Sequence, residues 1–162
     1  MILMVKKINY NIMPFQNTYR DDMIFCLLSA KDALGRIPRL NEDLLDIGKN
    51  YFDKGEMFWL ALDDHDRVVG MLGTNTIPAS GMWLKRFYVK PALKRNGLGS
   101  ALLATLEAYA KSKNISTLYT RCALDYIEGM QFYPAKGFVE VEHEDLVGIE
   151  YKDGVQPFVK NL

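Results

Sequence analysis

The apolar positions of this chain change their spacing several times, and each change of period indicates a new element of secondary structure. Residues 6–13 alternate between apolar and polar, which is typical of a strand, and Pro14 would end it because proline has no N–H to donate. Residues 19–34 follow a helical period, with carboxylates in the first turn and Gly35 as the terminator. The residues that this helix would bury are Met23, Cys26, Leu27 and Ala30.

The next segment predicts a second helix and then a hairpin. Asn41 can cap a helix that runs to about Tyr51. Its apolar positions are Leu44, Leu45 and Ile47. Residues 57–62 and 67–77 indicate two strands joined by the polar turn 63–66. The second strand is apolar on both faces, as expected of a strand in the middle of a sheet, at Val68, Val69, Met71 and Leu72.

The most informative stretch runs from Leu84 to Leu103, where a strand, a basic glycine loop and a helix follow one another without a gap. Its first residues favour a strand, but Leu84 is out of step with Phe87 and Val89. One extra residue near Lys85–Arg86 would restore the alternation, so we predict a β-bulge there. The helix that follows has one apolar face, formed by Leu98, Ala101, Leu102, Leu106, Tyr109 and Ala110.

The last third of the chain alternates strands with one short helix. Strands are predicted over 115–122, 138–142 and 155–159, and a helix over 128–136 that Gly137 ends. The main apolar residues of the first strand are Ile115, Leu118 and Tyr119, and Pro157 would place the last strand at an edge or bulge. The order β, α, α, β, β, β, α, β, α, β, β predicts a mixed sheet with helices on both sides. Residues 1–162 are expected to form one domain.

Composition excludes several classes of function. The chain has 20 basic and 20 acidic residues, so no net charge draws it to nucleic acid in general. Its two cysteines are too few for a disulfide framework and have no metal-ligand spacing, so no metal site is expected. No apolar run approaches the length of a membrane span and no signal peptide is visible. The default expectation is a cytoplasmic protein without a membrane partner.

The loop from Lys94 to Ser100 has the chemistry of an anion site. Gly97 and Gly99 let the backbone approach a ligand, and the N–H groups of a helix start favour an anion there. Lys94 and Arg95 add positive charge. By itself the pattern indicates either a phosphate or pyrophosphate cradle or a basic turn before a helix. A P-loop is excluded because GxxxxGK[ST] is missing, and a Rossmann site because GxGxxG is missing.

Two motifs in this order carry a more specific resemblance. Lys94-Arg95-Asn96-Gly97-Leu98-Gly99 is similar to the acetyl-CoA signature [QR]-x-x-G-x-[GA] of the GNAT acetyltransferase superfamily, with Lys94 at the Gln or Arg position. Residues 132–138, Phe-Tyr-Pro-Ala-Lys-Gly-Phe, resemble the FYxxxGF of the same family. The resemblance covers residues 58–138 well. It implies an α/β (α+β) fold with a mixed, mostly antiparallel central sheet of about seven strands flanked by helices on both faces.

The resemblance also implies a reaction and a set of site residues. It implies an enzyme that moves an acetyl group from acetyl-CoA, as co-substrate, directly to a primary amine of a small molecule or peptide. The coenzyme would be bound by Phe87, Tyr88, Val89, Lys94, Arg95, Asn96, Gly97, Leu98, Gly99 and Ser100. Tyr133, by position, would protonate the leaving thiolate. Dimers are common in the family, and nothing in the sequence decides whether this chain forms a homodimer.

The general base is missing where the family often has one. Relatives carry a glutamate near Met82 or Trp83, but this chain has no carboxylate from residue 77 to residue 99. Asp125 and Glu128 are either substitutes or ordinary charges at a helix start. A water chain, or an amine that arrives neutral, would need no base. The alternatives are therefore a non-catalytic acetyl-CoA-binding module that has lost the base, and a nucleotide-binding protein unrelated to acetyl transfer.

The acceptor is not specified by the sequence, because two charge signals disagree. Arg36 and Arg39, between the first two helices, either recognise a carboxylate or phosphate or are surface charges. The acidic stretch 140–145 would instead attract a cationic amine. Three further residues are given structural roles, with His65 in a turn, His143 at a strand end and Cys122 in the core.

Overall fold

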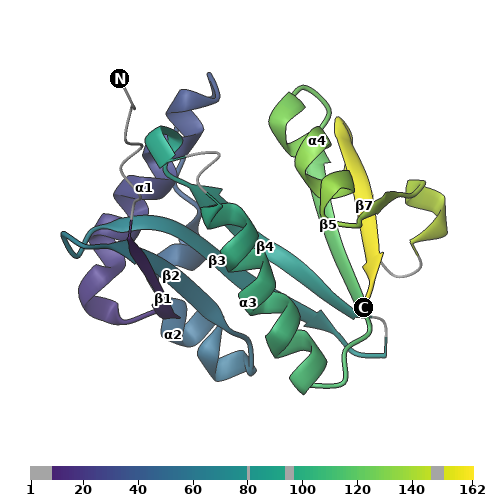
Figure 1. Cartoon of the computed structure of the whole chain (residues 1–162), viewed down its shortest axis with the longest axis horizontal. Helices are drawn as coiled ribbons and strands as arrows, with labels where there is room; N and C mark the ends of the chain where they lie inside the picture. Colours follow the sequence, from purple (N-terminus) through teal and green to yellow (C-terminus); the bar gives the residue numbers. More distant parts are fainter. Residues whose placement is uncertain (1–8, 80, 94–96, 147–151) are drawn as a thin grey trace, which may run out of the picture. The chain divides into compact units, whose positions relative to one another are not determined.

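The chain forms a seven-stranded mixed sheet with helices, as predicted (Figure 1). The computed structural model describes residues 9–79, 81–93, 97–146 and 152–162. The strands lie in the order β1-β2-β3-β4-β5-β7-β6. β1–β2, β2–β3, β5–β7 and β6–β7 are antiparallel pairs, and β4–β5 is a parallel pair. Their bounds are β1 Tyr10–Pro14, β2 Phe58–Asp63, β3 Val68–Ile77, β4 Gly81–Val89, β5 Thr117–Ala123, β6 Val139–Glu140 and β7 Val155–Asn161.

Within the described residues, four α-helices and several short 3₁₀ segments connect the strands. The α-helices are α1 Arg20–Ala33, α2 Ile47–Asn50, α3 Leu98–Ser112 and α4 Ile127–Ala135. The 3₁₀ segments are η1 Asn17–Tyr19, η2 Glu42–Leu45, η3 Phe52–Lys54, η4 Pro91–Leu93 and η5 His143–Asp145. Among the described helices, none is both long enough and apolar enough to cross a membrane. The predicted first strand is observed from Tyr10, and residues 6–8 of that prediction lie outside the described residues.

The chain divides into two compact units. Unit 1 contains residues 1–73 and 86–103, and unit 2 contains residues 74–85 and 104–162. The predicted coenzyme loop and the second half of β4 belong to unit 1, whereas Tyr133 belongs to unit 2. The prediction that residues 1–162 form a single domain stays a prediction.

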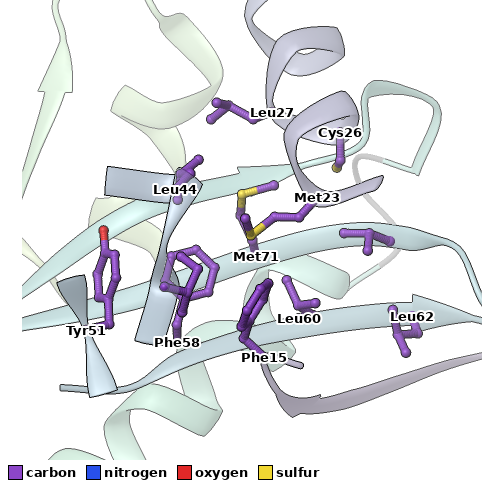
Figure 2. Packing of buried hydrophobic residues seen from close by; sticks show 12 residues of the cluster. Phe15, Met23, Cys26, Leu27, Leu44, Tyr51, Phe58, Leu60, Leu62 and Met71 are labelled. Carbon is purple, nitrogen blue, oxygen red and sulfur yellow. The ribbon is translucent and has the colours of Figure 1, made fainter. Parts of the chain in front are cut away.

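The core of unit 1 lies between α1, the short helical segments and β2–β3. Figure 2 shows Met23, Cys26 and Leu27 of α1 directed toward the strands, where Met71 meets them. These α1 residues are buried as the helical period predicted, together with Ala30. The β2 residues in the same cluster are Phe58, Leu60 and Leu62. They are every second residue, as expected of a strand with one face on the core.

The other face of these strands is covered by the start of α3. Neighbouring residues of a strand point to opposite faces, so Gly70 faces away from the cluster that contains Met71. A Cβ atom at Gly70 would lie 3.0 Å from Leu102 Cδ1 and 3.5 Å from Leu98 Cδ2. Glycine therefore allows α3 to approach β3 closely. Within unit 1, helices cover both faces of the strands.

The second helix was predicted to be continuous, and this prediction is wrong. Instead of one helix from Asn41 to Tyr51, the chain forms η2 and then α2, separated at Asp46, whose φ is −144°. The Asp46 side chain accepts a hydrogen bond from the Lys49 N–H and so caps the new helix. Leu45, one of the apolar positions of the predicted helix, is exposed.

In unit 2, α4 packs on β5 and β7. In β5 the buried residues are Leu118, Thr120 and Cys122. Of the three main apolar residues predicted for this strand, Leu118 is buried, Tyr119 is half-buried and Ile115 lies before the strand begins. A Cβ atom at Gly129 of α4 would lie 2.6 Å from Cys122 Sγ, so the helix approaches the strand closely at this glycine. Figure 1 shows α4 (light green) beside β5, with β7 (yellow) running next to β5.

Pro157 lies inside the sheet, which corrects the prediction of an edge or bulge. β7 pairs with β5 on one side and with β6 on the other. The Pro157 carbonyl accepts a hydrogen bond from the Val141 N–H at 3.2 Å, on the β6 side. Because the N and O atoms of one residue point the same way in an antiparallel ladder, the missing N–H also faces β6. The missing N–H therefore does not interrupt the pairing of β7 with β5, and β6 itself ends at Glu140.

An ion pair attaches α1 to the β2–β3 hairpin of unit 1. Arg67 Nη2 lies 2.8 Å from Asp22 Oδ1, and the Val68 N–H donates to Asp22 Oδ2 at 2.8 Å. The hydrogen bond from Arg67 outweighs the effect of partial burial and lowers the pKa of Asp22 below its ordinary value of 3.8. The folded state therefore favours the ionised Asp22 carboxylate.

We expect this carboxylate to make the fold sensitive to acid. A group with a lowered folded-state pKa stabilises the fold above its unfolded pKa, and this contribution is lost as the pH falls through the folded value. Asp22→Asn should cost about 1–2 kcal/mol at pH 7, and this cost should shrink as the pH falls below 3.8 through the folded-state pKa of Asp22. Urea unfolding at several pH values measures this, with Asp21→Asn as control because Asp21 is 90% exposed. An equal loss of unfolding free energy at neutral and at acidic pH would contradict the stabilising role of the ionised Asp22 carboxylate.

Candidate functional site

At the position of the bulge predicted in β4, the backbone of Arg86 is irregular. Its φ is +53°, in the left-handed region that residues other than glycine rarely adopt. Such a conformation costs about 1–3 kcal/mol and persists only where neighbouring contacts hold it. The described pairing of β4 with β5 joins Met82 to Leu118 and Trp83 to Tyr119, before the irregularity.

The contacts that hold Arg86 come from a segment 43 residues earlier. Arg86 Nη2 lies 2.8 Å from Asp43 Oδ1 and Arg86 Nε lies 3.1 Å from Asp43 Oδ2, a bidentate pair. The Tyr51 hydroxyl donates a hydrogen bond of 2.6 Å to Asp43 Oδ2. Figure 2 shows the Tyr51 ring beside Phe58, with its hydroxyl oxygen pointing out of the apolar cluster.

This network keeps Asp43 ionised. Burial alone would raise the pKa of Asp43, but the hydrogen bonds from Arg86 and Tyr51 lower it below its ordinary value of 3.8. Burial, and then the hydrogen bond to Asp43, raise the pKa of Tyr51. Both Asp43 oxygens accept hydrogen bonds at neutral pH, so this carboxylate is a poor acceptor for a substrate proton. It fixes the shape of the strand instead.

We expect Asp43→Asn to destabilise unit 1. The substitution leaves Arg86 half-buried without its counter-charge and weakens the contact that holds its backbone. The expected cost is about 2 kcal/mol, less than for a fully buried pair because both side chains are 26% exposed. Urea unfolding measures this, with Glu42→Gln as the control because Glu42 is the exposed neighbour of Asp43. Equal stability of the two variants would show that the pair does not hold the bulge.

Two more side chains lie within electrostatic reach of this network, Tyr88 and Lys31. Tyr88 is half-buried against the unit 1 core; burial raises its pKa, and the charges of Arg86 and Arg36 partly oppose this. Lys31 donates from Nζ to the Asn41 side-chain oxygen at 2.7 Å and to the Arg39 carbonyl. Burial, followed by the charges of Arg86 and Arg36, lowers the pKa of Lys31.

The predicted anion loop is described in part. Lys94, Arg95 and Asn96 lie outside the described residues, whereas Gly97 and α3 are inside them. The φ of Gly97 is +78°, and among the described residues, apart from its chain neighbours, no heavy atom would lie within 4 Å of a Cβ atom there. The Gly97 carbonyl accepts a hydrogen bond of 3.0 Å from the Ala101 N–H, at the start of α3.

Packing fixes the direction of this helix start. Leu98 is buried to 1% exposure beside Gly70 of β3, while Gly99 and Ser100 are half-buried in the first turn. The first N–H groups of an α-helix have no partner within the helix and carry its positive dipole end. Residues 97–100 thus supply open space and backbone donors, the combination that a pyrophosphate requires.

The strand residues predicted to accompany the coenzyme lead directly into this loop. Phe87, Tyr88 and Val89 are half-buried at the end of β4. The next residue, Lys90, donates its N–H to the Val69 carbonyl of β3 at 2.8 Å, so this end of β4 stays attached to unit 1. The bulge, the strand end and the helix start are therefore parts of one compact unit.

Tyr133, the predicted acid, is fixed in unit 2 by aromatic packing. Its ring is 9% exposed and lies 5.4 Å from the Phe138 ring and 5.5 Å from the Phe158 ring, measured between centroids. Phe132 makes a further edge contact at 5.4 Å. The Tyr133 ring therefore packs among the aromatic side chains of unit 2. The role of its hydroxyl stays a prediction.

Of the remaining candidates, His65 and Cys122 lie where predicted, whereas His143 was expected at a strand end and instead begins η5, after β6 has ended at Glu140. Asp125 and Glu128 are exposed before and within the first turn of α4. His65 is exposed in the hairpin turn. His143 contacts the Val155 carbonyl at 3.3 Å, and Cys122 is buried. Among the described residues no group of His, Cys, Asp or Glu side chains could hold a metal ion.

Unit 2 also contains an aromatic contact at Trp83, near the position where the sequence resemblance implied a glutamate. Trp83 is 8% exposed and stacks on Tyr119 with 5.4 Å between ring centroids. The Arg121 guanidinium lies over the Trp83 ring at 4.8 Å. Trp83 therefore packs in unit 2, where its ring contacts side chains of β5.

Comparison with known proteins identifies the class. The chain belongs to the acetyltransferase (GNAT) family, whose sequence model matches residues 19–138. It is 28% identical over 102 residues to human N-acetyltransferase 8, a match that covers 59% of this chain and 44% of that protein. The chain therefore spans less than half of the length of this relative.

Solved structures of the same family have the same fold. A GNAT acetyltransferase from Staphylococcus aureus superposes with a TM-score of 0.85 and 26% identity, covering 94% of this chain and 99% of that one. PaiA N-acetyltransferase from Thermoplasma acidophilum, solved in complex with coenzyme A, gives a TM-score of 0.72 at 18% identity, covering 95% and 99%. The second likeness concerns the fold alone.

Proposed function

We propose that this chain is an N-acetyltransferase that moves an acetyl group from acetyl-CoA directly to a primary amine of a small molecule or peptide. Membership of the GNAT family supports acetyl transfer as the reaction class. The observation that carries the proposal for this chain is the left-handed Arg86 in β4, followed in the same unit by the glycine-started helix α3.

In this proposal the coenzyme follows β4 into α3. The pyrophosphate lies at residues 94–100, where Gly97 leaves open space and the first turn of α3 presents N–H groups. The pantetheine arm runs beside Phe87, Tyr88 and Val89 and pairs with their backbone like an added strand. A bulge supports this arrangement because it locally disrupts a ladder and releases backbone groups for a ligand.

The chemistry is a direct acyl transfer. The neutral amine nitrogen attacks the thioester carbonyl carbon, the C–S bond breaks, and the amine loses its proton as the amide forms. The thiolate takes a proton from the Tyr133 hydroxyl, which solvent then restores. Most of the acceleration would come from positioning and from backbone donors near the thioester carbonyl.

The amine must lose a proton before it attacks, and the chain offers no carboxylate in β4 for this step. Asp43 is the described carboxylate nearest the bulge, but its hydrogen bonds to Arg86 and Tyr51 keep it ionised and engaged. We therefore place no side-chain base in the mechanism. The amine arrives neutral or passes its proton to water.

Thiol release from acetyl-CoA tests this proposal against its alternative. The missing carboxylate from residue 77 to residue 99 favours, as a second candidate, a module that binds acetyl-CoA without catalysis. An enzyme releases free CoA only when a suitable amine is added, and the product gains the mass of one acetyl group. Tight acetyl-CoA binding without release across a broad panel of amines would support the binding module instead.

A further inference from the structure

Resting on the proposed function, we infer that Asp43 and Tyr51 are positioning residues of the acyl-transfer site, because they hold Arg86 in its left-handed conformation. The relevant juxtaposition joins a carboxylate from η2 and the hydroxyl of the residue after α2 to the guanidinium of a β4 residue, all within unit 1. In this role Arg86 supplies a backbone conformation to the site, and its side chain is the means by which that conformation is held.

The left-handed conformation of Arg86 differs from the others in the chain by its place in the fold. The described residues other than glycine that have a positive φ are Asp66, Ala79, Arg86 and Asn114. Three of them lie outside the helices and strands, where turns use this conformation. Arg86 instead lies inside β4, where a left-handed φ interrupts an extended backbone. An arginine does not favour this conformation by itself, so contacts must hold it.

The contacts with Asp43 hold the arginine side chain at two points. Nη2 and Nε of the Arg86 guanidinium donate to the two oxygens of the Asp43 carboxylate at 2.8 and 3.1 Å. A bidentate pair fixes the orientation of the guanidinium as well as its distance from the carboxylate. The backbone conformations open to Arg86 are therefore limited to those from which its guanidinium reaches Asp43.

The Asp43 carboxylate is itself anchored to the core of unit 1. The Tyr51 hydroxyl donates to Asp43 Oδ2 at 2.6 Å. The Tyr51 ring is 4% exposed and packs on Phe58, with 4.9 Å between ring centroids (Figure 2). The next residue after Asp43 in η2, Leu44, is fully buried in the same cluster. The core therefore fixes the carboxylate through its backbone and through the tyrosine, and the carboxylate fixes Arg86.

Arg86 lies where a backbone conformation affects the proposed reaction. In the proposed function the pyrophosphate lies at the start of α3, and the pantetheine arm runs back along Val89 and Phe87, which brings the thioester toward Arg86. A left-handed residue turns its flanking peptide groups out of the alternating directions of a regular strand. Stabilisation of a developing charge by fixed dipoles depends on their orientation. The Arg86–Asp43 pair therefore sets the orientation of the peptide dipoles beside the thioester.

The test separates the backbone conformation of residue 86 from its charge. Arg86→Gly removes the guanidinium but adopts a positive φ without assistance, whereas Arg86→Ala removes the guanidinium and disfavours that φ. Both substitutions are made in the Asp43→Asn chain, so that no carboxylate is left half-buried without its counter-charge. Thiol release from acetyl-CoA is measured with the most reactive amine of a panel that includes glycine, L-lysine, spermidine, tryptamine and a peptide with a free N-terminus. Calorimetry gives Kd for acetyl-CoA.

We expect Asp43→Asn to lower kcat about tenfold and to leave Kd for acetyl-CoA within about threefold, because the substitution leaves residues 97–100 unchanged. A tenfold loss corresponds to about 1.4 kcal/mol, within the usual cost of a left-handed residue. Adding Arg86→Gly should restore kcat to within about threefold of the unmodified chain, whereas adding Arg86→Ala should not restore it. Tyr51→Phe, which keeps the ring, should lower kcat about threefold, and Arg86→Gly should restore that loss as well.

Asp22→Asn is the matched control for a general loss of stability. Asp22 makes a second bidentate pair in unit 1, with Arg67, whose Nη2 also lies 2.8 Å from a carboxylate oxygen. The hydrogen bonds described for the Asp22 carboxylate go to Arg67 and Val68 of the β2–β3 hairpin. This variant should lose stability on the same scale as Asp43→Asn, yet its kcat should stay within about twofold of the unmodified chain.

A crystal structure of Asp43→Asn provides a readout that requires no activity. The φ of Arg86 should leave the left-handed region in this variant, and a retained positive φ overturns the inference. If Asp43→Asn does not fold, Tyr51→Phe takes its place in the kinetic comparison, because it keeps both the ion pair and the ring.

The kinetic outcomes separate this inference from the proposed function. Equal kcat in Asp43→Asn and Asp22→Asn overturns the inference and leaves the acetyltransferase standing. Equal kcat in the glycine and alanine variants at residue 86 also overturns it, because the reaction would then not depend on the left-handed backbone. Absence of thiol release with every amine in the unmodified chain, while acetyl-CoA binds, overturns the proposed function and the inference with it.

Discussion

Gly97→Val is expected to weaken acetyl-CoA binding by at least about a hundredfold. Gly97 has φ +78° and open space in front of its Cα atom, the space in which we place the pyrophosphate. A branched side chain would fill that space and force the backbone away from the left-handed region. Loss of two or more hydrogen bonds to a charged group accounts for about 3 kcal/mol or more. Isothermal titration calorimetry with acetyl-CoA measures the effect.

Gly55→Val is a matched control for this experiment. Gly55 also has φ +78°, and a Cβ atom there also meets nothing within 4 Å, but it follows η3 and belongs to no proposed site. Both variants should lose similar stability, and only the first should lose affinity. If Gly97→Val does not fold, Gly97→Ala and Gly55→Ala replace the pair. Equal affinity of the two variants would place the coenzyme elsewhere.

Tyr133→Phe is expected to lower kcat about a hundredfold with little change in acetyl-CoA affinity. Removal of a general acid typically costs a factor of 10² or more, about 10²–10⁴. The ring contacts with Phe138 and Phe158 do not involve the hydroxyl, so the phenylalanine should keep the packing. Steady-state thiol release and a calorimetric Kd separate the two quantities.

The control is Tyr19→Phe, whose hydroxyl donates to Asp66 at 2.7 Å at the surface of unit 1. It should have normal kcat. With an acetyl donor whose leaving thiol is more acidic, kcat should be less sensitive to the Tyr133 substitution. A less basic thiolate can leave without being protonated. Unchanged kcat in Tyr133→Phe would limit this residue to packing. A parallel loss of coenzyme affinity would indicate a structural disturbance.

The bulge could be predicted because a strand has a strict period of two. Leu84 and Phe87 cannot both face one side without an extra residue, and the structure has its left-handed residue at Arg86. The buried face of α1 was also predictable, since a regular helix repeats every 3.6 residues and Met23, Cys26 and Leu27 share a stripe. These features depend on local periodicity alone.

The partner of Arg86 could not be predicted in the same way. Asp43 lies 43 residues away, and nothing local to either residue indicates the pair. The available signal was weak, namely an unusual arginine at the predicted bulge. The break at Asp46 was missed because the apolar positions fit one helix as well as two short segments. Pro157 was predicted at an edge or bulge because proline has no N–H. The internal strand β7 tolerates the missing N–H because its neighbour β6 is short.

The central claim, that this chain binds acetyl-CoA at the β4–α3 junction, is tested most directly by calorimetric titration of the purified chain with acetyl-CoA. CoA, ATP and NAD serve as comparisons, and a characterised acetyltransferase serves as the positive control. The account predicts saturable binding of acetyl-CoA and CoA, and much weaker binding of ATP and NAD. No binding of acetyl-CoA at a concentration that saturates the control, or equal binding of ATP, would contradict it.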